Sequence, residues 1–426
     1  MKKLVIYASL FLPLSAFAGG FQLNLQGLKA ASMGGAATGI ASDASTVFYN
    51  PAGMSHLNGH QFTFGFNLID PSVSIQTPEV ANTNQTSKRA TPIHFYYSGQ
   101  INEKLHFGFL INNQFGSSSS FEDDWQGRYI IQNISLKTFM FQPTVSYKLH
   151  DKISVGGGFV YARGSFSTEK AIPVSSSTST EGKASLSGSG DAVGYNLGIF
   201  SNFLTLAHGA SSTKLNVGIS YRSELAVDLT NGEAEFTNIP VALQGTFPAK
   251  TGFTSKLTLP QVFTAGLSAQ HIKENYSVTF IYDFNWTGWS SYDTLTFKFD
   301  NTDTPESKTT KDWQDVVTHR FGVDFTYKEK FSVRAGLYID NSPIKEGYVS
   351  PELPDISQTA YTAGLGYKIN DTFSVDFSFI RQSAERKDKL LVANFDATYR
   401  RKVNVYGLAL NIKLGNKSSK NDIKTE

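Results

Sequence analysis

The chain of 426 residues contains no cysteine, which excludes disulfides, thiolate chemistry and cysteine-based zinc sites. Tryptophan and methionine are scarce, with 4 of each, whereas Phe 33 and Tyr 19 supply aromatic residues that favour strands. An excess of one charge is also lacking, because Lys+Arg 38 and Asp+Glu 36 leave a net charge of +2. That balance argues against nucleic acid as the main partner. The length fits two or three ordinary domains or one large β-barrel.

Long hydrophobic runs are missing as well, apart from one at the N-terminus. Two lysines precede the apolar run Leu4–Leu14, and Ala16-Phe17-Ala18 follows it. A basic start, a short apolar stretch and an A-x-A site are typical of a secretory signal peptide, and the run is too short for a membrane span. We therefore expect residues 1–18 to be a signal peptide and the exported, mature chain to begin at Gly19. A membrane anchor is the alternative.

Downstream of Asn58, segments with alternating polar and apolar residues recur between turn signals. They number about fourteen, an even count as bacterial outer-membrane barrels require. The predicted strands are His60–Ile69, Thr91–Gln100, Leu105–Gly116, Ile131–Leu149, Ile153–Thr168, Ala192–Leu204, Lys214–Leu229, Gln261–Ala269, Tyr276–Trp286, Thr318–Tyr327, Phe331–Ile339, Ala360–Ile369, Phe373–Gln382 and Val403–Leu414.

The connections between these strands alternate between short polar turns and long loops, such as Glu169–Asp191 and Ser383–Lys402. A barrel inserted in one direction produces this parity, with short periplasmic turns and long extracellular loops. In "FSVDFSFI", Phe377 and its apolar neighbours oppose Asp376 and its polar neighbours. Such a pattern suits an apolar outer face and a polar lumen. The sequence thus predicts an all-β protein, a 14-stranded antiparallel transmembrane barrel over residues 59–414.

A barrel of fourteen strands is too wide for its own side chains to fill. The remaining sizeable segment, residues 19–58, is rich in glycine and alanine and contains short helix signals, with Asn50 as a cap and Pro51 as a first helical residue. We expect it to be a small helical hatch that plugs the lumen, anchored by Asn50, Pro51 and Ala52. A disordered leader is the alternative, and residues 415–426 form a polar C-terminal tail.

Several motifs resemble one known family, the long-chain fatty-acid outer-membrane transporters (FadL family), which includes toluene-type hydrocarbon transporters. They run in the family's order along the mature chain. The motifs are Gly20-Phe21-Gln22-Leu23-Asn24, Asn50-Pro51-Ala52-Gly53, "WQGRY" at Trp125–Tyr129, "YRSELAVDL" at Tyr221–Leu229, "LTLPQ" at Leu257–Gln261 and "YIDNSP" at Tyr338–Pro343.

The resemblance implies passive uptake of long-chain fatty acids or similar hydrophobic compounds across the outer membrane of a Gram-negative bacterium, without enzymatic activity and without a cofactor or metal. Expected partners are the hydrophobic ligand, outer-membrane lipid, lipopolysaccharide and the barrel-assembly machinery, with the protein as a monomer. A structural or adhesive barrel that binds surfaces through its loops is the alternative. The acidic run Glu122–Asp124 lacks the ligand spacing of a calcium loop.

A buried fatty-acid carboxylate needs a cationic partner. The candidates are Arg163 and Lys170 at the base of the third long loop and Lys308 and Lys311 in the fifth, although solvated loop cations are an equally good interpretation. By resemblance, Gly19, Gly20 and Phe21 lie near the same pocket.

The third strand loses its alternation at Asn112, Asn113 and Gln114, just before Phe115 and Gly116. A lipid-facing Asn113 is unfavourable unless the strand bends inward and the plug supplies partners for its freed backbone groups. The alternative is that the strand has reached the outer interface. The resemblance favours the bend, since the family opens a lateral gap at this place.

Overall fold

The structure is a computed structural model, and it describes residues 19–415 except 82, 87 and 175–180. The expected signal peptide and nearly all of the expected C-terminal tail therefore lie outside the described residues. No helix in the described part of the chain is long and apolar enough to cross a membrane.

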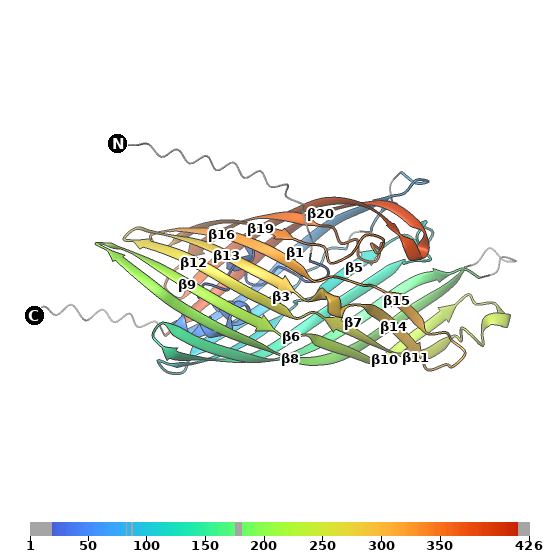
Figure 1. Cartoon of the computed structure of the whole chain (residues 1–426), viewed down its shortest axis with the longest axis horizontal. Helices are drawn as coiled ribbons and strands as arrows, with labels where there is room; N and C mark the ends of the chain where they lie inside the picture. Colours follow the sequence, from blue (N-terminus) through green and yellow to red (C-terminus); the bar gives the residue numbers. More distant parts are fainter. Residues whose placement is uncertain (1–18, 82, 87, 175–180, 416–426) are drawn as a thin grey trace, which may run out of the picture.

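Antiparallel strands close into a barrel of 14 spans (Figure 1). The last strand pairs with the first along its whole length, from His60 opposite Leu414 to Gln76 opposite Thr398. The strands are β1 (His60–Gln76), β2 (Thr83–Asn84), β3 (Ile93–Gln100), β4 (Leu105–Asn112), β5 (Gly116–Ser120), β6 (Asn133–His150), β7 (Ile153–Ile172), β8 (Gly182–His208), β9 (Ser211–Arg222), β10 (Leu225–Thr237), β11 (Lys250–Leu259), β12 (Val262–Lys273), β13 (Tyr276–Thr287), β14 (Thr294–Phe299), β15 (Ser307–Thr310), β16 (Val316–Tyr327), β17 (Phe331–Asp340), β18 (Gln358–Lys368), β19 (Phe373–Leu390) and β20 (Phe395–Leu414).

Some spans consist of two successive strands with an interruption between them. The pairs are β4 and β5, β9 and β10, β11 and β12, β13 and β14, and β15 and β16. Two short 3-10 helices lie in the connections between spans, η2 (Val241–Leu243) and η4 (Leu391–Ala393), and a third, η3 (Trp289–Ser291), lies in the interruption between β13 and β14.

Two connections that we expected as long loops are mostly strand. β19 and β20 pair as far as Leu390 and Phe395, so the expected loop Ser383–Lys402 shrinks to a tight tip. β7 and β8 likewise pair as far as Ile172 and Gly182 within the expected loop Glu169–Asp191. Beyond the membrane both faces of a strand meet water, so the period-two signal disappears although the hydrogen-bond ladder continues.

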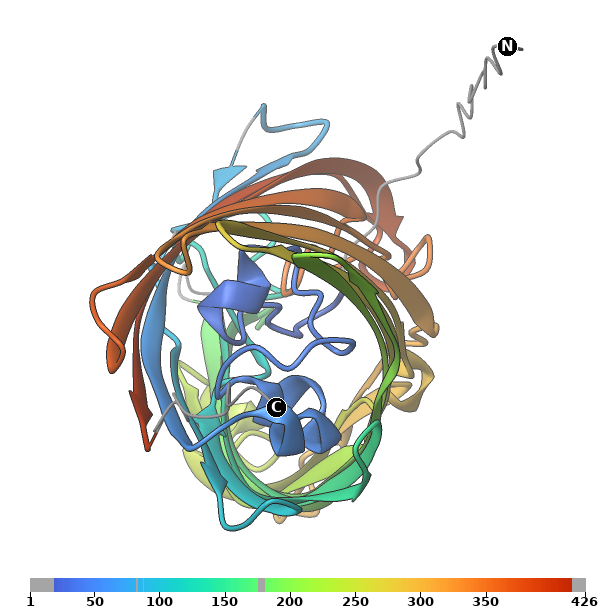
Figure 2. The ribbon, with the colours of Figure 1, turned by 90° about the vertical axis from the view of Figure 1, so that its left-hand side faces the viewer.

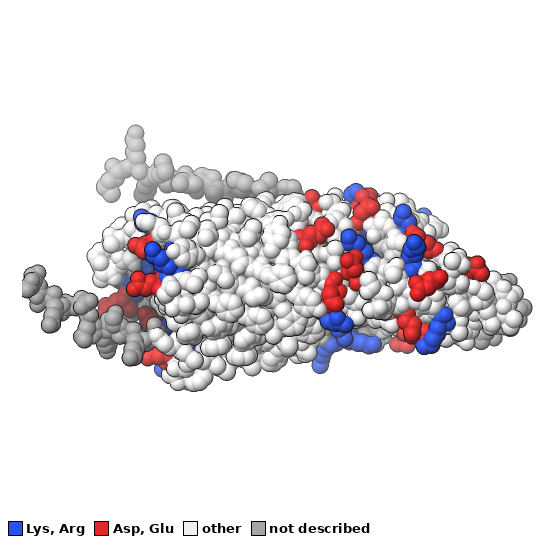
Figure 3. Space-filling view, turned by 90° about the horizontal axis from the view of Figure 1, so that it is seen from below, with Lys and Arg blue, Asp and Glu red and all other residues white. Residues whose placement is uncertain are grey.

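The faces of the barrel have the expected polarity. Phe377 and Phe325 are 41% and 43% exposed on the outside, whereas Asp376 and Asp324 are buried within the lumen. Between the charged ends, a broad band of the visible surface is free of Lys, Arg, Asp and Glu (Figure 3). Inside, Arg334 pairs with Asp324 at 2.7 Å and with Asp376 at 2.5 Å. An apolar exterior over a polar lumen suits a lipid environment.

The N-terminal segment lies inside the ring of strands (Figure 2). It contains α1 (Leu28–Ala31), α2 (Thr46–Tyr49) and the 3-10 helix η1 (Pro51–His56). Asn50 caps η1, because its side chain accepts a hydrogen bond from the Ala52 N–H and Pro51 follows as the first helical residue. The helical hatch expected from the sequence therefore occupies the lumen.

Candidate functional site

Asn50 fixes the hatch to the wall of the barrel. Its buried amide donates to the Thr38 carbonyl of the hatch (3.1 Å) and to the Ile199 carbonyl of β8 (2.9 Å). Its side-chain oxygen accepts from the Ala52 N–H at 3.1 Å. One side chain thus satisfies three backbone groups, two in the hatch and one on β8, and so links the hatch to the barrel.

Glycines on three neighbouring strands leave room for this junction. A Cβ on Gly156 of β7 would stand 2.6 Å from the Ala52 nitrogen, and one on Gly198 of β8 would stand 2.3 Å from Asn50 Oδ1. On β9, a Cβ at Gly218 would stand 1.9 Å from the Thr38 carbonyl oxygen. At these three points the backbone of the hatch lies so close to the wall that a side chain would not fit.

Buried charged residues of the wall bind the hatch backbone elsewhere. Asp283 accepts from the Ala37 and Thr38 N–H groups, both at 2.9 Å. Arg320 donates to the Gly34 carbonyl at 3.3 Å and to Asn24 Oδ1 at 2.8 Å. Arg222 donates to the Phe48 carbonyl and lies over its ring, 4.6 Å from the centroid. The hatch is thus held by directed bonds as well as by its small residues.

The third span is interrupted between Asn112, where β4 ends, and Gly116, where β5 begins. The backbone groups freed there bond to the N-terminal segment. Gln114 O accepts from the Leu23 N–H (2.8 Å), and the Gly116 N–H donates to Phe21 O (3.0 Å). The interruption lies at the residues where the sequence alternation fails, and its backbone partners come from the hatch and, at Phe115, from the Thr138 hydroxyl of β6.

At the interruption, side chains make hydrogen bonds in place of the missing backbone pairs. Asn113 accepts from the Ile93 N–H of β3 at 3.0 Å and donates to the Thr138 carbonyl of β6 at 2.7 Å. Asn112 points inward and donates to Gln26 Oε1 of the hatch at 2.8 Å, while the Gln26 amide donates to Asn113 O at 2.7 Å. Side-chain amides therefore replace the missing ladder between β3 and β6.

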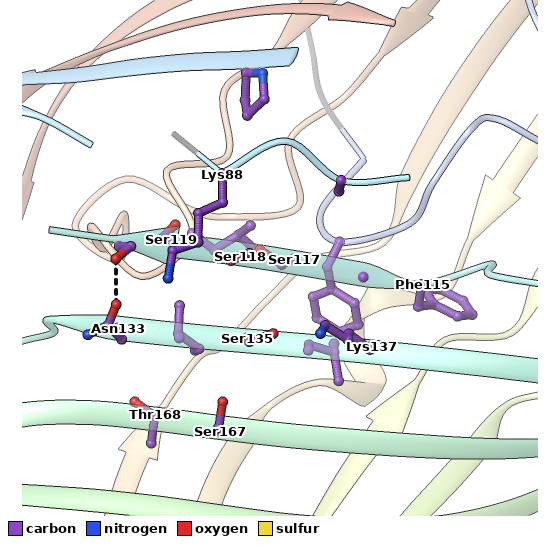
Figure 4. Close-up of a pocket in the computed structure, with 18 of the residues that line it drawn as sticks. Lys88, Phe115, Ser117, Ser118, Ser119, Asn133, Ser135, Lys137, Ser167 and Thr168 are labelled. Atoms are coloured by element: carbon purple, nitrogen blue, oxygen red, sulfur yellow. Dashed lines mark hydrogen bonds between the residues drawn. The ribbon is translucent and has the colours of Figure 1, made fainter. Parts of the chain in front are cut away.

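A cavity of about 1070 Å³ lies at this interruption. Its lining includes Phe21 and Leu23 of the N-terminal segment and also Lys137 and Phe139, which share the outward face of β6. Figure 4 shows the polar side of the pocket, where Ser117, Ser118 and Ser119 of β5 lie beside Asn133, Ser135 and Lys137 of β6, and Ser167 and Thr168 lie on β7. The same cavity is thus bounded by residues of the lumen and of the outer face. We refer to it as the wall pocket.

Phe21 forms the floor of an apolar lumen. Its ring centroid lies 4.7 Å from that of Trp289, 5.5 Å from Tyr292, 5.6 Å from Trp313 and 6.1 Å from Phe115. Towards the long loops, buried apolar side chains of many strands continue this cluster; they include Phe166, Leu186, Val227, Phe236, Phe253, Leu257, Phe297, Ile344, Val349 and Tyr399. An apolar interior in this half of the barrel suits a hydrophobic guest.

The structure brings some of the expected ligand-binding residues together and separates others. Gly20 lies between the rings of Trp289 and Trp313, beside Phe21. Lys311 is 13% exposed, lies near Tyr292 and pairs with Glu352 at 2.7 Å. Burial lowers the pKa of Lys311, but the Glu352 carboxylate outweighs that effect, so the pKa lies above its ordinary value.

The other three expected cations lie away from this floor. Arg163 is 56% exposed and pairs with Asp191 at 3.0 Å, on the same face of β7 as the lipid-facing Phe159. Lys170 is exposed at the end of β7, and Lys308 is exposed on β15. Lys311 is therefore the candidate that the fold links to this floor, through Tyr292, whose ring lies 5.5 Å from that of Phe21.

Sequence reasoning missed several polar residues around Gly19 and Gly20. Asp340 and Asp355 are buried beneath these glycines, and Arg401 lies 3.8 Å from Asp355. Burial raises the pKa of Asp355 to about 7. Asp340 belongs to the "YIDNSP" motif, which flags it, whereas no local pattern marks Asp355. Within the part of the chain that the structure describes, no group of three or more His, Asp or Glu residues is placed to hold a metal ion.

Comparisons with known proteins agree with this architecture. The family described as "Outer membrane protein transport protein (OMPP1/FadL/TodX)" matches residues 9–414. The chain is 25% identical to the long-chain fatty acid transport protein of Salmonella typhi, over 88% of this chain and 90% of that one.

Among solved structures, a Pseudomonas aeruginosa FadL homologue superimposes with a TM-score of 0.75 at 18% identity, covering 93% of this chain and 100% of that one. The Pseudomonas putida toluene transporter TodX gives 0.68 at 15% identity, covering 94% and 100%. These two likenesses establish the shared fold. Because the family match spans nearly the whole sequence, the chain belongs to the OMPP1/FadL/TodX family, whose members are transport proteins of the Gram-negative outer membrane and not enzymes.

Proposed function

We propose that this chain is a passive transporter that takes up long-chain fatty acids or similar hydrophobic molecules, binds them in the lumen and releases them sideways through the wall pocket. A dedicated route has a physical rationale. At about 0.8 kcal/mol per methylene, transfer of a fourteen-methylene tail from lipid to water costs on the order of 11 kcal/mol. An aqueous pore would serve such a molecule poorly, so the route should avoid water.

The apolar lumen supports binding above the hatch. Phe21, Trp289 and Trp313 supply a floor on which an aliphatic chain can lie without exposure to water. Lys311 is the cation nearest this floor among the expected head-group partners, and Arg401 lines the wall pocket. A ligand with one carboxylate suits these cations better than an uncharged hydrocarbon, although a relative of each kind is known.

The wall pocket is the single observation that carries the lateral route. Its lining joins Phe21 on the lumen side to Phe139 on the lipid side, at the one place where the third span gives up its ladder. A molecule that leaves here passes from an apolar lumen to the membrane without crossing water. The hatch lies inside the ring of strands, so a ligand that leaves along the axis would have to pass it, whereas the wall pocket leads sideways.

Filling the wall pocket tests this route. Gly116 lines the pocket, and a Cβ added there would meet only ordinary contacts, Leu136 O at 3.4 Å and Leu23 Cδ1 at 3.5 Å. Gly116→Phe should therefore fold and place a ring in the pocket. In vesicles that contain the purified protein, radiolabelled oleate transfer should slow markedly, while oleate binding to the detergent-solubilised protein is retained.

Gly245→Phe is the matched control, because Gly245 lies in a loop where no atom stands within 4 Å of an added Cβ. It should transfer oleate at the wild-type rate. If Gly116→Phe inserts normally and also transfers at that rate, the lateral route is wrong. If wild-type vesicles take up oleate no faster than protein-free vesicles, the transport function itself is wrong.

A further inference from the structure

Two carboxylates lie side by side beneath the N-terminal segment. Asp340 ends β17 and is 3% exposed, and Asp355 lies in the following connection and is 0% exposed. Among the described residues, their one ion-pair contact is Arg401 Nη1, 3.8 Å from Asp355 Oδ1. Arg320 is near Asp340, but its guanidinium donates to the hatch at Asn24 and Gly34. The pair is therefore short of direct cationic partners.

The first two N–H groups of the described chain point at these carboxylates. The Gly20 N–H donates to Asp355 Oδ2 at 3.1 Å, and the Gly19 N–H donates to Asp340. A Cβ on Gly19 would stand 2.8 and 2.9 Å from the two Asp340 oxygens, so Gly19 lies directly against that carboxylate. The remaining oxygen of Asp355 is buried without a hydrogen-bond partner in the described structure.

The other partners of Asp340 are uncharged. Thr318 donates to it at 2.7 Å and Asn24 at 3.3 Å. Burying two neighbouring carboxylates without a close cation is unfavourable by several kcal/mol, and the raised pKa of Asp355, about 7, reflects this. The site has the shape and the charge to accept a small cation at the position of the Gly19 nitrogen.

We propose that the mature N-terminal ammonium of Gly19 is this cation, and that Asp340 and Asp355 form its binding site. Hydrolysis of the Ala18–Gly19 peptide bond by a signal peptidase adds the hydroxyl of water to the Ala18 carbonyl carbon. The Gly19 nitrogen leaves as an amine and takes up a proton. Removal of the leader thus converts one neutral donor into a charged group with three. The proposal rests on cleavage after Ala18 and is independent of the transported ligand.

This site would couple maturation to the wall pocket. The segment that follows Gly20 is the one that pairs with the interrupted third span, where Gln22 forms an antiparallel bridge with Phe115. Fixing the first residue at Asp340 and Asp355 holds Phe21 in the aromatic floor and Leu23 against Gln114. In the unprocessed chain the ammonium is absent from this place, so the segment is less firmly held.

The reactivity of the α-amine measures the pairing. Purified full-length mature protein is treated with cyanate, which reacts with the neutral amine, across a range of pH, and the N-terminal peptide is quantified by mass spectrometry. A free α-amine has a pKa of about 7.7 to 8.0. We expect the titration midpoint of the Gly19 amine to lie at least about one pH unit higher. Its rate of reaction with cyanate at pH 7 should therefore be at most about a tenth of that of a free α-amine.

Asp355→Asn and Asp340→Asn should each move the midpoint back towards the ordinary value, because the amide keeps the shape and removes the charge. Asp371→Asn is the matched control, since its side chain is 94% exposed on a short turn, and it should leave the midpoint unchanged. If Asp340→Asn does not fold, Asp355→Asn still decides the question.

Inserting two glycines between Ala18 and Gly19 supplies the second test. The ammonium then lies two residues upstream while Gly19, Gly20 and both carboxylates remain. The amine should react about tenfold faster at pH 7 than in the wild type, with an ordinary midpoint. The proposal is overturned if the wild-type amine reacts like that of the insertion variant, or if the mature chain begins at a residue other than Gly19.

Discussion

Replacing Asn50 with alanine tests how the hatch is held in the barrel. The change removes three hydrogen bonds, of which those to Thr38 O and the Ala52 N–H are buried and the one to Ile199 O is partly buried. At about 1 kcal/mol net for each bond, attachment of the hatch weakens by about 3 kcal/mol. That free energy corresponds to about a hundredfold increase in the detached population.

Detachment should appear as leakage. We expect Asn50→Ala to raise single-channel conductance in planar bilayers and to sensitise cells to a large hydrophilic antibiotic. The barrel should persist, because Asn50 makes one bond to a strand whose ladder is otherwise complete. Resistance of the folded band to unfolding in detergent should therefore change little.

Asn58→Ala is the matched control, since Asn58 is exposed at the end of the hatch. It should leave conductance at the wild-type value. If Asn50→Ala inserts correctly and remains as impermeable as the wild type, the other contacts of the hatch, including those to Asp283, Arg320 and Arg222, hold it without the Asn50 amide. The role assigned to the Asn50 amide is then wrong.

Four further changes probe the rest of the design. Gly218→Val should raise leakage because its Cβ would stand 1.9 Å from Thr38 O, whereas Gly157→Val, whose nearest neighbour stands at 3.3 Å on the outer face, should be silent in the same conductance assay. Arg334→Leu leaves Asp324 and Asp376 buried without their cation and should lower the free energy of unfolding by about 3 to 5 kcal/mol. The temperature at which the barrel unfolds on gels should therefore fall. Lys368→Leu breaks an exposed ion pair and should change that temperature little. Burial, together with Lys148, lowers the pKa of His56 from 6.5 to about 4, so the folded hatch binds fewer protons than the unfolded chain. The contribution of His56 to stability is therefore full well above pH 6.5 and falls by about 3 kcal/mol as the pH drops towards 4. His56→Gln should abolish this loss in thermal unfolding. Lys311→Met should weaken binding of oleate but not of an alkane of equal length, while Lys308→Met should leave both affinities unchanged in a fluorescence displacement assay.

The barrel was predictable because its signals are local. Alternation in β19 places Phe377 outside and Asp376 inside, and each strand carries such a pattern by itself. The hatch was predictable from the caps at Asn50 and Pro51 together with the width of a fourteen-strand barrel. Strand ends were not, because polar hairpins such as that of β19 and β20 continue where alternation has ceased.

The site was harder to predict because its contacts join distant parts of the chain. Asp355 and Gly20 are 335 residues apart in the sequence and come together only in the folded barrel, and no local sequence pattern marks their contact. Arg163 was chosen for its closeness to a loop, yet it shares a face of β7 with Phe159, so the alternation already indicated an outward position. The interruption of the third span had a local signal, the run of amides from Asn112 to Gln114, and the structure places it there.

The contacts of the hatch with late strands bear on the order in which the barrel assembles. The hatch emerges first, yet its partners include Arg320 on β16 and Thr362 on β18, which bonds to both Ser32 O and the Gly34 N–H. The seam between β1 and β20 needs the last strand to be made. The hatch can therefore meet β8 through Asn50 early, but it lacks the partners on β16 and β18 until those strands exist, and it must already be inside when the seam closes. Filling of the lumen and closure of the ring are thus coupled during biogenesis, and a chain truncated before β16 lacks the contacts that Arg320 and Thr362 make with the hatch.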